Sequence, residues 1–168
     1  MTKPEILKSV DALAPRLVET AKAIFAYREL SYEETRSSAA LAALLENEGF
    51  EVVWKQAGLE TAFVAKYGSG GPHIALMGEY DALPEVGHAC GHNMIGTIGA
   101  GAALALKKSG VPRPGEGTVY FVGCPAEERG GGKIALCEAG VFDSMDAALG
   151  IHPRDISSGF DMSYAIKT

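Results

Sequence analysis

Three short apolar runs, each followed at once by residues that can bind a metal ion, set the strongest limit on how this chain can fold. The runs occupy residues 74–78, 118–123 and 147–151. The first two lack polar alternation, which is typical of strands buried on both faces. Helical periodicity fills the segments around the runs, and this alternation predicts an α/β sheet with helices on both faces. Functional loops of such sheets gather at the carboxyl ends of the strands, so we expect the three loops to meet.

The N-terminal part of the chain is predicted to be helical. Apolar residues recur at helical spacing through residues 1–28, where Pro15 would kink the helix or mark a restart. Ser31 and the glutamate three residues later form a capping-box pattern, so a second helix is expected from about Tyr32. Gly49 suits the end of that helix, because glycine readily adopts the left-handed conformation found there.

The rest of the chain continues the alternation of strands and helices. The further expected elements are strands at 50–54 and 61–66 and helices at 94–108 and 133–139. Asn93 or a neighbour is expected to cap the helix at 94–108. Three glycines in that helix, Gly96, Gly99 and Gly101, cost helix propensity and therefore indicate close packing against another element.

Cys90 and His92 form the first candidate for a metal site. They stand two residues apart in the stretch GEYDALPEVGHACGHN, on the loop after the first apolar run. Gly91 between them allows a tight turn that lets both side chains reach one ion, and thiolate and imidazole are ligands of zinc and similar metals. A buried structural cysteine beside a hydrogen-bonded histidine is the alternative for this pair alone.

An acidic pair and a histidine follow the other two runs. Glu127 and Glu128 come after the second run, and His152 comes after the third. On extended backbone the two acids would point in opposite directions, whereas on a loop one can bind a metal while the other faces a reacting water. An exposed acidic pair at a helix N-terminus is the alternative. Because ligand-type residues follow all three runs, we favour one metal site that combines them with Cys90 and His92.

The remaining candidates have weaker signals. Asp81 is the best candidate for a carboxylate that orients a ligand imidazole, although it could instead order the turn in DALP. His88 is expected to support the site or face the substrate. His73 begins a strand and is expected to have no functional role, and Cys124 and Cys137 are expected in or near the core.

Composition narrows the class of protein. A formal net charge of −6 without a cluster of lysine or arginine argues against a nucleic-acid partner. We expect no membrane segment, because no apolar stretch is long enough, and no signal peptide, because the N-terminus lacks its features. Three cysteines suit free thiols or a metal ligand better than disulfides. A cytoplasmic globular protein is therefore expected.

Three stretches, GEYDALPEVGHACGHN, GTVYFVGCPAEERGGGK and DAALGIHP, resemble motifs of the M20 family of di-metal metallopeptidases. The resemblance is to the amidohydrolase branch, which includes hippurate hydrolase, indole-acetyl-amino-acid hydrolases and related dipeptidases. YRELSYEE extends the resemblance to the N-terminal part, so it covers essentially the whole chain. It implies a three-layer α/β/α catalytic domain of the zinc-exopeptidase kind.

The resemblance also implies roles for individual residues. Those that match metal ligands are Cys90, His92, Glu128 and His152. Among them Cys90 matches the ligand that bridges the two metals. Glu127 matches the general base, and Asp81 matches the carboxylate that orients the site. Glu79 stands where other branches have a ligand histidine, and we do not count it as a ligand.

The implied activity is hydrolysis of the amide bond in N-acyl amino acids or dipeptide-like substrates. Two divalent ions, Zn, Mn or Co, would polarise the carbonyl and activate water. Two alternatives stay open from the residues alone. One is a thiol hydrolase with Cys90 as nucleophile. The other is an inactive fragment or a non-catalytic binding module of the same fold.

Length is the main departure from the family. Family members are considerably longer, and they insert a lid and dimerisation domain near the point where this sequence stops. They then return to complete the catalytic domain with one more histidine ligand. We therefore expect residues 1–168 to be the N-terminal portion of the catalytic domain, with the lid boundary at 163–168 and the lid absent. A homodimer is expected for the full-length protein.

Overall fold

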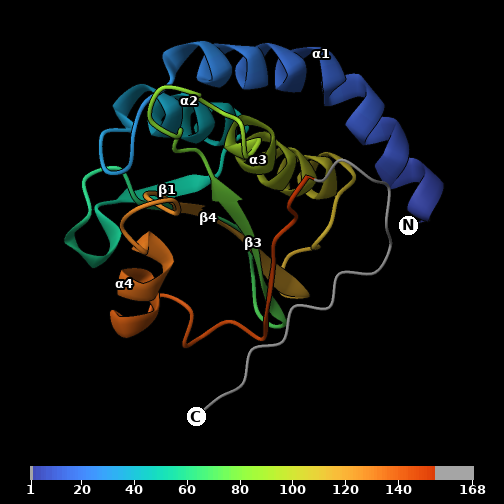
Figure 1. Cartoon of the computed structure of the whole chain (residues 1–168). Helices are drawn as coiled ribbons and strands as arrows, with labels where there is room; N and C mark the ends of the chain where they lie inside the picture. Colours follow the sequence, from blue (N-terminus) through green and yellow to red (C-terminus); the bar gives the residue numbers. More distant parts are fainter. Residues whose placement is uncertain (1, 154–168) are drawn as a thin grey trace.

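A five-stranded mixed sheet with helices on both faces forms the centre of the computed structural model, which describes residues 2–153 (Figure 1). Its elements in chain order are α1 (Lys3–Tyr27), α2 (Thr35–Glu46), β1 (Glu51–Trp54), the short 3₁₀ helix η1 (Gln56–Gly58), β2 (Phe63–Ser69), β3 (His73–Glu79), α3 (His92–Lys108), β4 (Gly117–Cys124), α4 (Gly132–Glu138) and β5 (Ala147–Leu149). The expected α/β class is confirmed.

The order and direction of the strands bring the carboxyl ends of β3, β4 and β5 to the same end of the sheet. The order is β1-β2-β4-β3-β5, and β3 runs parallel to both β4 and β5. The first two strands pair antiparallel, and β2 pairs antiparallel with β4, so the sheet is mixed. Gly78 lies opposite Gly123 near the ends of β3 and β4. The loops after β3, β4 and β5 therefore begin side by side, as expected.

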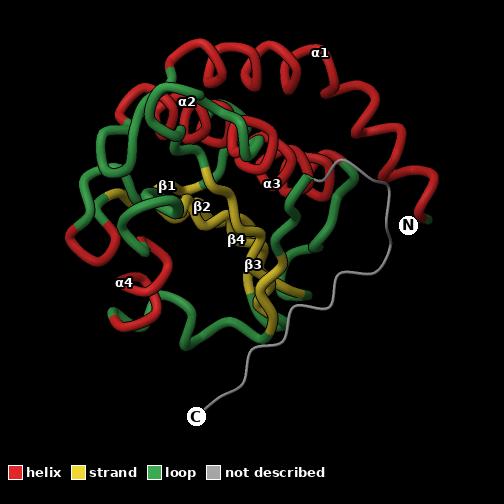
Figure 2. The backbone as a smooth tube through the Cα atoms, in the orientation of Figure 1, coloured by secondary structure: helices red, strands yellow, loops and turns green. Residues whose placement is uncertain are grey.

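The helices divide between the two faces of the sheet. In Figures 1 and 2, α1, α2 and α3 lie over one face and α4 lies over the other. Successive residues of β4 serve the two faces: Phe121 packs into a core cluster with Ile24 and Leu104, whereas Val122 packs into a second cluster with Leu136. This alternation follows from the pleat of a strand. The central strand β4 is buried along almost its whole length.

The glycines of α3 let that helix lie directly on β3. A methyl group at Gly96 would come within 2.7 Å of the carbonyl oxygen of Glu79, and one at Gly99 within 2.7 Å of that of Met77. These distances are too short for a side chain, so the close packing expected from the glycines is confirmed. Because α3 begins at His92, the same packing sets that histidine beside the end of β3.

The second helix begins later than expected. Tyr32 has a φ of 68°, in the left-handed region, and α2 starts only at Thr35. Ser31 donates its hydroxyl hydrogen to Asp81 instead of capping the helix, so the expected capping box is wrong. The preceding helix α1 continues past Pro15 to its end at Tyr27.

Other boundaries differ by a few residues. The start of α3 follows Gly91, whose φ is 79°, and the expected cap Asn93 instead donates its side-chain amide to the carbonyl of Ala21 in α1. The second strand begins and ends later than 61–66, and the last ends before 151. No helix within residues 2–153 is long and apolar enough to cross a membrane. The expected lid boundary lies outside the described residues.

Candidate functional site

The imidazole of His92 is the centre of the candidate site. Its Nδ1–H donates to the carboxylate of Asp81 at 2.9 Å and lies 3.0 Å from the same residue's carbonyl oxygen. These contacts fix the tautomer, so Nε2 of the neutral ring carries the lone pair. Nε2 is buried and has no hydrogen-bond partner among residues 2–153. Burial would lower the pKa of His92, but the bond to Asp81 and the charges of the nearby acids raise it.

Three carboxylates face Nε2 of His92. The nearest oxygen belongs to Glu79 at 3.2 Å, and Glu127 and Glu128 each bring an oxygen to 3.7 Å. The adjacent acids do not point in opposite directions, because the backbone turns sharply at Ala126, whose φ is 55°. The side chain of Glu127 is 38% exposed and that of Glu128 is 16% exposed. The two acids thus approach the same imidazole with different access to solvent.

Asp81 connects the loop after β3 to the loop after β4. One carboxylate oxygen accepts from His92, and the other accepts from the hydroxyl of Ser31 at 2.8 Å and the backbone amide of Glu128 at 3.0 Å. Burial would raise the pKa of Asp81, but these three hydrogen bonds lower it. An ionised carboxylate with these contacts can orient the imidazole, which is the role expected for it.

The other two expected ligands lie at the same end of the sheet. The carboxylate of Glu128, burial and the other surrounding acids raise the pKa of the Cys90 thiol to about 11. The ring of His152 lies 6.1 Å from the ring of His92, centroid to centroid, in an edge-on arrangement. Its Nδ1–H donates to the carbonyl of Pro153 at 2.8 Å. The structure therefore brings all four expected ligands to one region.

Glu79 and Lys133 add an ion pair that was not predicted from the sequence. One oxygen of Glu79 binds the ammonium group of Lys133, and the other is buried without a hydrogen-bond partner among the described residues. Burial would lower the pKa of Lys133, and the bond and charge of Glu79 raise it. An acid at the end of an apolar strand is a signal that could have identified Glu79. No local signal identifies Lys133, which lies 54 residues away.

The donor atoms fit a divalent cation. Within residues 2–153, ligand atoms of Glu79, His92 and Glu127 all lie within 4.8 Å of one another. Two of these residues contribute the buried unpartnered atoms described above. Four carboxylates lie around His92, and of these Glu79 pairs with the ammonium group of Lys133, so the site carries an excess of negative charge. This group shares His92 with the expected ligand set, and it adds Glu79 and the expected base Glu127.

Several secondary expectations can be compared with the structure. His88 donates from Nε2 to the carbonyl of Ile24 in α1, and its Nδ1 is buried without a hydrogen-bond partner among residues 2–153, so its expected role stays a prediction. Cys137 is exposed on α4 and not near the core, whereas Cys124 is buried as expected. His73 hydrogen-bonds Tyr120 at the far end of β3, consistent with no role in the site.

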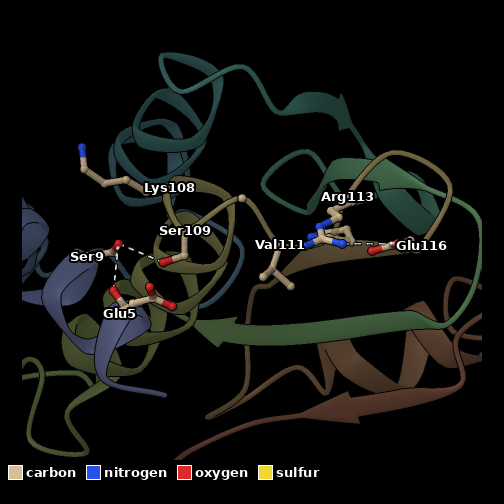
Figure 3. A pocket seen from close by; sticks show the side chains of 9 residues that line it. Glu5, Ser9, Lys108, Ser109, Val111, Arg113 and Glu116 are labelled. Atoms are coloured by element: carbon tan, nitrogen blue, oxygen red, sulfur yellow. Dashed lines mark hydrogen bonds and ion pairs between the residues drawn. The ribbon is translucent and has the colours of Figure 1, made fainter. Parts of the chain in front are cut away.

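A separate cavity of about 750 Å³ lies away from these residues (Figure 3). It is bordered by the start of α1, the end of α3 and the loop before β4, where Ser9 and Ser109 share a hydrogen bond of 2.8 Å. Glu116 lines the cavity just before β4, whereas Glu127 lies just after it. The cavity is thus at the opposite end of β4, and it contains none of the expected ligands.

Comparisons with known proteins agree with this geometry. A sequence profile described as "Peptidase family M20/M25/M40" matches residues 75–165. Over 170 residues the chain is 39% identical to a component of the p-aminobenzoyl-glutamate hydrolase of Escherichia coli, and the match covers 91% of this chain and 35% of that protein. It is 38% identical to the Xaa-Arg dipeptidase of Mus musculus, covering 95% of this chain and 40% of that protein. The chain therefore spans well under half the length of these two relatives.

A solved structure with a similar fold is a dinuclear metal binding peptidase from the M20 family of Bacillus subtilis. The match has a TM-score of 0.76 and 29% sequence identity, and it covers 86% of this chain and 44% of that one. The expected fold, an incomplete catalytic domain of the M20 type, is confirmed by this similarity together with the observed sheet.

Proposed function

The chain belongs to peptidase family M20/M25/M40, a family of metal-dependent peptidases and amidohydrolases, and on this basis we propose that its protein hydrolyses the amide bond of N-acyl amino acids or dipeptide-like substrates. The observation that carries the proposal is the buried Nε2 of His92. It has no hydrogen-bond partner among the described residues and is faced by three carboxylates. A lone pair and converging acids of this kind are what a divalent cation requires.

We assign the metal-holding role to Cys90, His92, Glu128 and His152, and the structure adds Glu79 as a further candidate. When bound, two divalent ions such as Zn²⁺, Mn²⁺ or Co²⁺ would polarise the substrate carbonyl and make water a stronger acid.

We propose different roles for Glu127 and Glu128, based on the exposed fractions of their side chains. Glu127 is the more exposed of the two, so its carboxylate can reach a water molecule in the open part of the site. It takes a proton from the attacking water and then gives a proton to the leaving amine nitrogen. Glu128 is less exposed, and its backbone amide donates to Asp81, which suits a holding role. Asp81 keeps His92 in the tautomer that presents Nε2.

The thiol hydrolase alternative is disfavoured by the surroundings of Cys90. A nucleophilic cysteine needs a lowered pKa, usually from a neighbouring imidazolium or a helix N-terminus. Glu128, burial and the other nearby acids instead raise the pKa of the Cys90 thiol to about 11. A raised pKa keeps the thiol protonated and unreactive near neutral pH. The same thiol remains suitable as a metal ligand, because coordination deprotonates it.

Cobalt binding followed by visible absorption tests the proposed site. Co²⁺ should bind the chelator-stripped chain and show a thiolate charge-transfer band, which Cys90→Ser should remove. Glu128→Gln should weaken binding, whereas Glu127→Gln should leave it nearly unchanged. Glu116→Gln, an exposed acid at the opposite end of β4, is the control. Failure of the wild-type chain to bind Co²⁺ any better than Glu128→Gln would contradict the proposed metal site.

Turnover of N-acyl amino acids and dipeptides by the full-length protein tests the reaction itself. Activity should require metal and survive a thiol alkylator applied to the metal-loaded protein. Glu127→Gln should lower kcat by about 10²- to 10⁴-fold, the usual contribution of a general base. Turnover that survives a chelator but is lost on alkylation would support the thiol hydrolase. Tight metal binding without turnover of any member of the panel would favour a non-catalytic module.

A further inference from the structure

The loop that carries Glu127 and Glu128 is held at both ends by one distant segment of the chain. Glu34 accepts a hydrogen bond from the backbone amide of Ala126 at 2.8 Å. Tyr32 donates its phenolic hydrogen to the carbonyl of Gly130 at 2.6 Å. These contacts join residues more than 90 positions apart, and they bracket the acidic pair on either side.

The first contact holds a strained residue. Ala126 has a φ of 55°, a left-handed conformation that costs a residue with a side chain about 1–2 kcal/mol. Its carbonyl accepts from the amides of Gly130 and Gly132 at 3.1 and 3.3 Å, so the loop folds back on itself. This turn directs both acids toward one imidazole. Relaxation of Ala126 to extended backbone would instead send neighbouring side chains in opposite directions.

The second feature is the complete burial of Glu34. Its side chain is fully inaccessible, and its carboxylate also accepts from the backbone amide of Tyr32 and the hydroxyl of Thr61, each at 2.8 Å. Although Glu34 stands at the start of α2, its side chain bonds none of the first amides of that helix in the described structure. The carboxylate therefore serves the tertiary contact with Ala126, not the helix cap.

The same segment makes two further contacts with the loop, one by packing at Gly130 and one through Asp81. A methyl group at Gly130 would lie 2.2 Å from the ring of Tyr32, so the phenol ring rests directly against that glycine. Ser31 donates to the oxygen of Asp81 that also accepts from the amide of Glu128. Glu34 thus contacts the beginning of the loop, Ser31 contacts its middle through Asp81, and Tyr32 contacts its end.

We propose that residues 31–34 act as a clamp on the acidic loop, in which Tyr32 and Glu34 are positioning residues that hold Glu127 and Glu128 against His92. This inference rests on the proposed function, because the value of the arrangement is to keep two acids ready for metal and water. The clamp adds to that function a dependence of the loop geometry on Tyr32 and Glu34, which bond the loop backbone and are not among the proposed metal ligands.

Tyr32→Phe is the sharpest test, because the residue is 45% exposed and only one hydrogen bond is removed. We expect Co²⁺ affinity to fall about 10-fold, the lower range for residues that support metal ligands, with little change in melting temperature. Backbone amide shifts of residues 127–130 should change in the metal-free chain. Tyr120→Phe, which removes a Tyr hydroxyl bonded to His73 at the far end of the sheet, should change neither quantity.

A pair of substitutions at Glu34 separates positioning from folding. Glu34→Gln can still accept from both backbone amides through its oxygen and can donate to the hydroxyl of Thr61, so affinity should stay within a few-fold of wild type. Glu34→Ala should lose at least 10-fold in affinity. Glu34→Ala that stays folded and binds Co²⁺ like wild type would overturn the clamp. If wild type itself binds no Co²⁺, the proposed function fails, and unchanged amide shifts in Tyr32→Phe would then overturn the clamp independently.

Discussion

Alanine substitutions at two glycines of α3 should have opposite effects on stability. Both residues are buried in the same helix, so the intrinsic gain in helix propensity is the same. They differ in what a new methyl group would meet. At Gly99 it would lie 2.7 Å from the backbone carbonyl of Met77 and 3.1 Å from the ring of Phe121. At Gly101 it would lie 2.7 Å from a methyl group of Leu17, a flexible and only partly buried side chain.

The expected magnitudes follow from these neighbours. Alanine is about 0.8–1.0 kcal/mol better than glycine in a helix interior. Overpacking against a rigid backbone costs roughly 1–3 kcal/mol. Gly99→Ala should therefore destabilise the chain by up to about 2 kcal/mol, because the carbonyl of Met77 belongs to the sheet and cannot move aside. Gly101→Ala should range from neutral to about 1 kcal/mol more stable, because Leu17 can change rotamer.

Chemical denaturation of the metal-free chain measures both changes. The two variants should differ by about 2 kcal/mol in free energy of unfolding, or roughly 4–8 °C in melting temperature for a chain of this size. Because α3 begins at His92, Gly99→Ala should also weaken Co²⁺ binding more than Gly101→Ala does. Equal stabilities for the two variants would refute the reasoning, since they share helix, residue type and burial and differ only in the facing group.

Two further substitutions test the charges around the site. Lys133→Met leaves Glu79 without its cation and should destabilise the metal-free chain by about 1–3 kcal/mol, between the values for exposed and buried pairs. Added Zn²⁺ should recover much of this loss in a thermal scan. The control Lys55→Met, in an exposed pair with Glu60, should change stability little. A loss of stability in Lys133→Met that Zn²⁺ does not reduce would count against a cation site beside Glu79. Asp81 has a lowered pKa, so its stabilisation is full above its ordinary value of 3.8 and is lost as the pH falls through the lowered value. Asp81→Asn should flatten that acid limb of the stability curve, and an unchanged limb would place the acid sensitivity elsewhere.

The fold class and the meeting of three loops were predictable because they depend on local patterns. Apolar runs at 74–78 and 118–123 specify buried strands, and the helical segments between them permit the parallel pairing of β3 with β4. The parallel pairing then fixes which ends meet. The glycines of α3 were equally informative, since each marks a close contact: Gly96 and Gly99 lie against β3, and Gly101 lies against Leu17 of α1.

The roles of residues 31–34 were not predictable from local patterns. Ser31 and Glu34 match a capping box letter for letter, yet Ser31 bonds Asp81 and Glu34 bonds Ala126. A capping box and a tertiary clamp use the same donors and acceptors, so local sequence cannot separate them. Tyr32 decides the outcome, because its left-handed backbone stops the helix from starting there. That conformation depends on contacts with residues about 50 to 100 positions away.

The limits of prediction follow from what each group of residues does. Residues proposed to hold metal or move protons are recognisable by type, because only thiols, imidazoles and carboxylates do that chemistry. Bringing three carboxylates to within 4 Å of one imidazole is unfavourable without a cation, so other contacts must resist their mutual repulsion. In this chain three sets of contacts oppose the repulsion. Lys133 pairs with Glu79, and Asp81 accepts a hydrogen bond from the amide of Glu128. The clamp bonds the backbone on either side of the acidic pair. Residues that hold the site in this way are of common types and act through partners distant in the sequence, so the folded structure is needed to identify them.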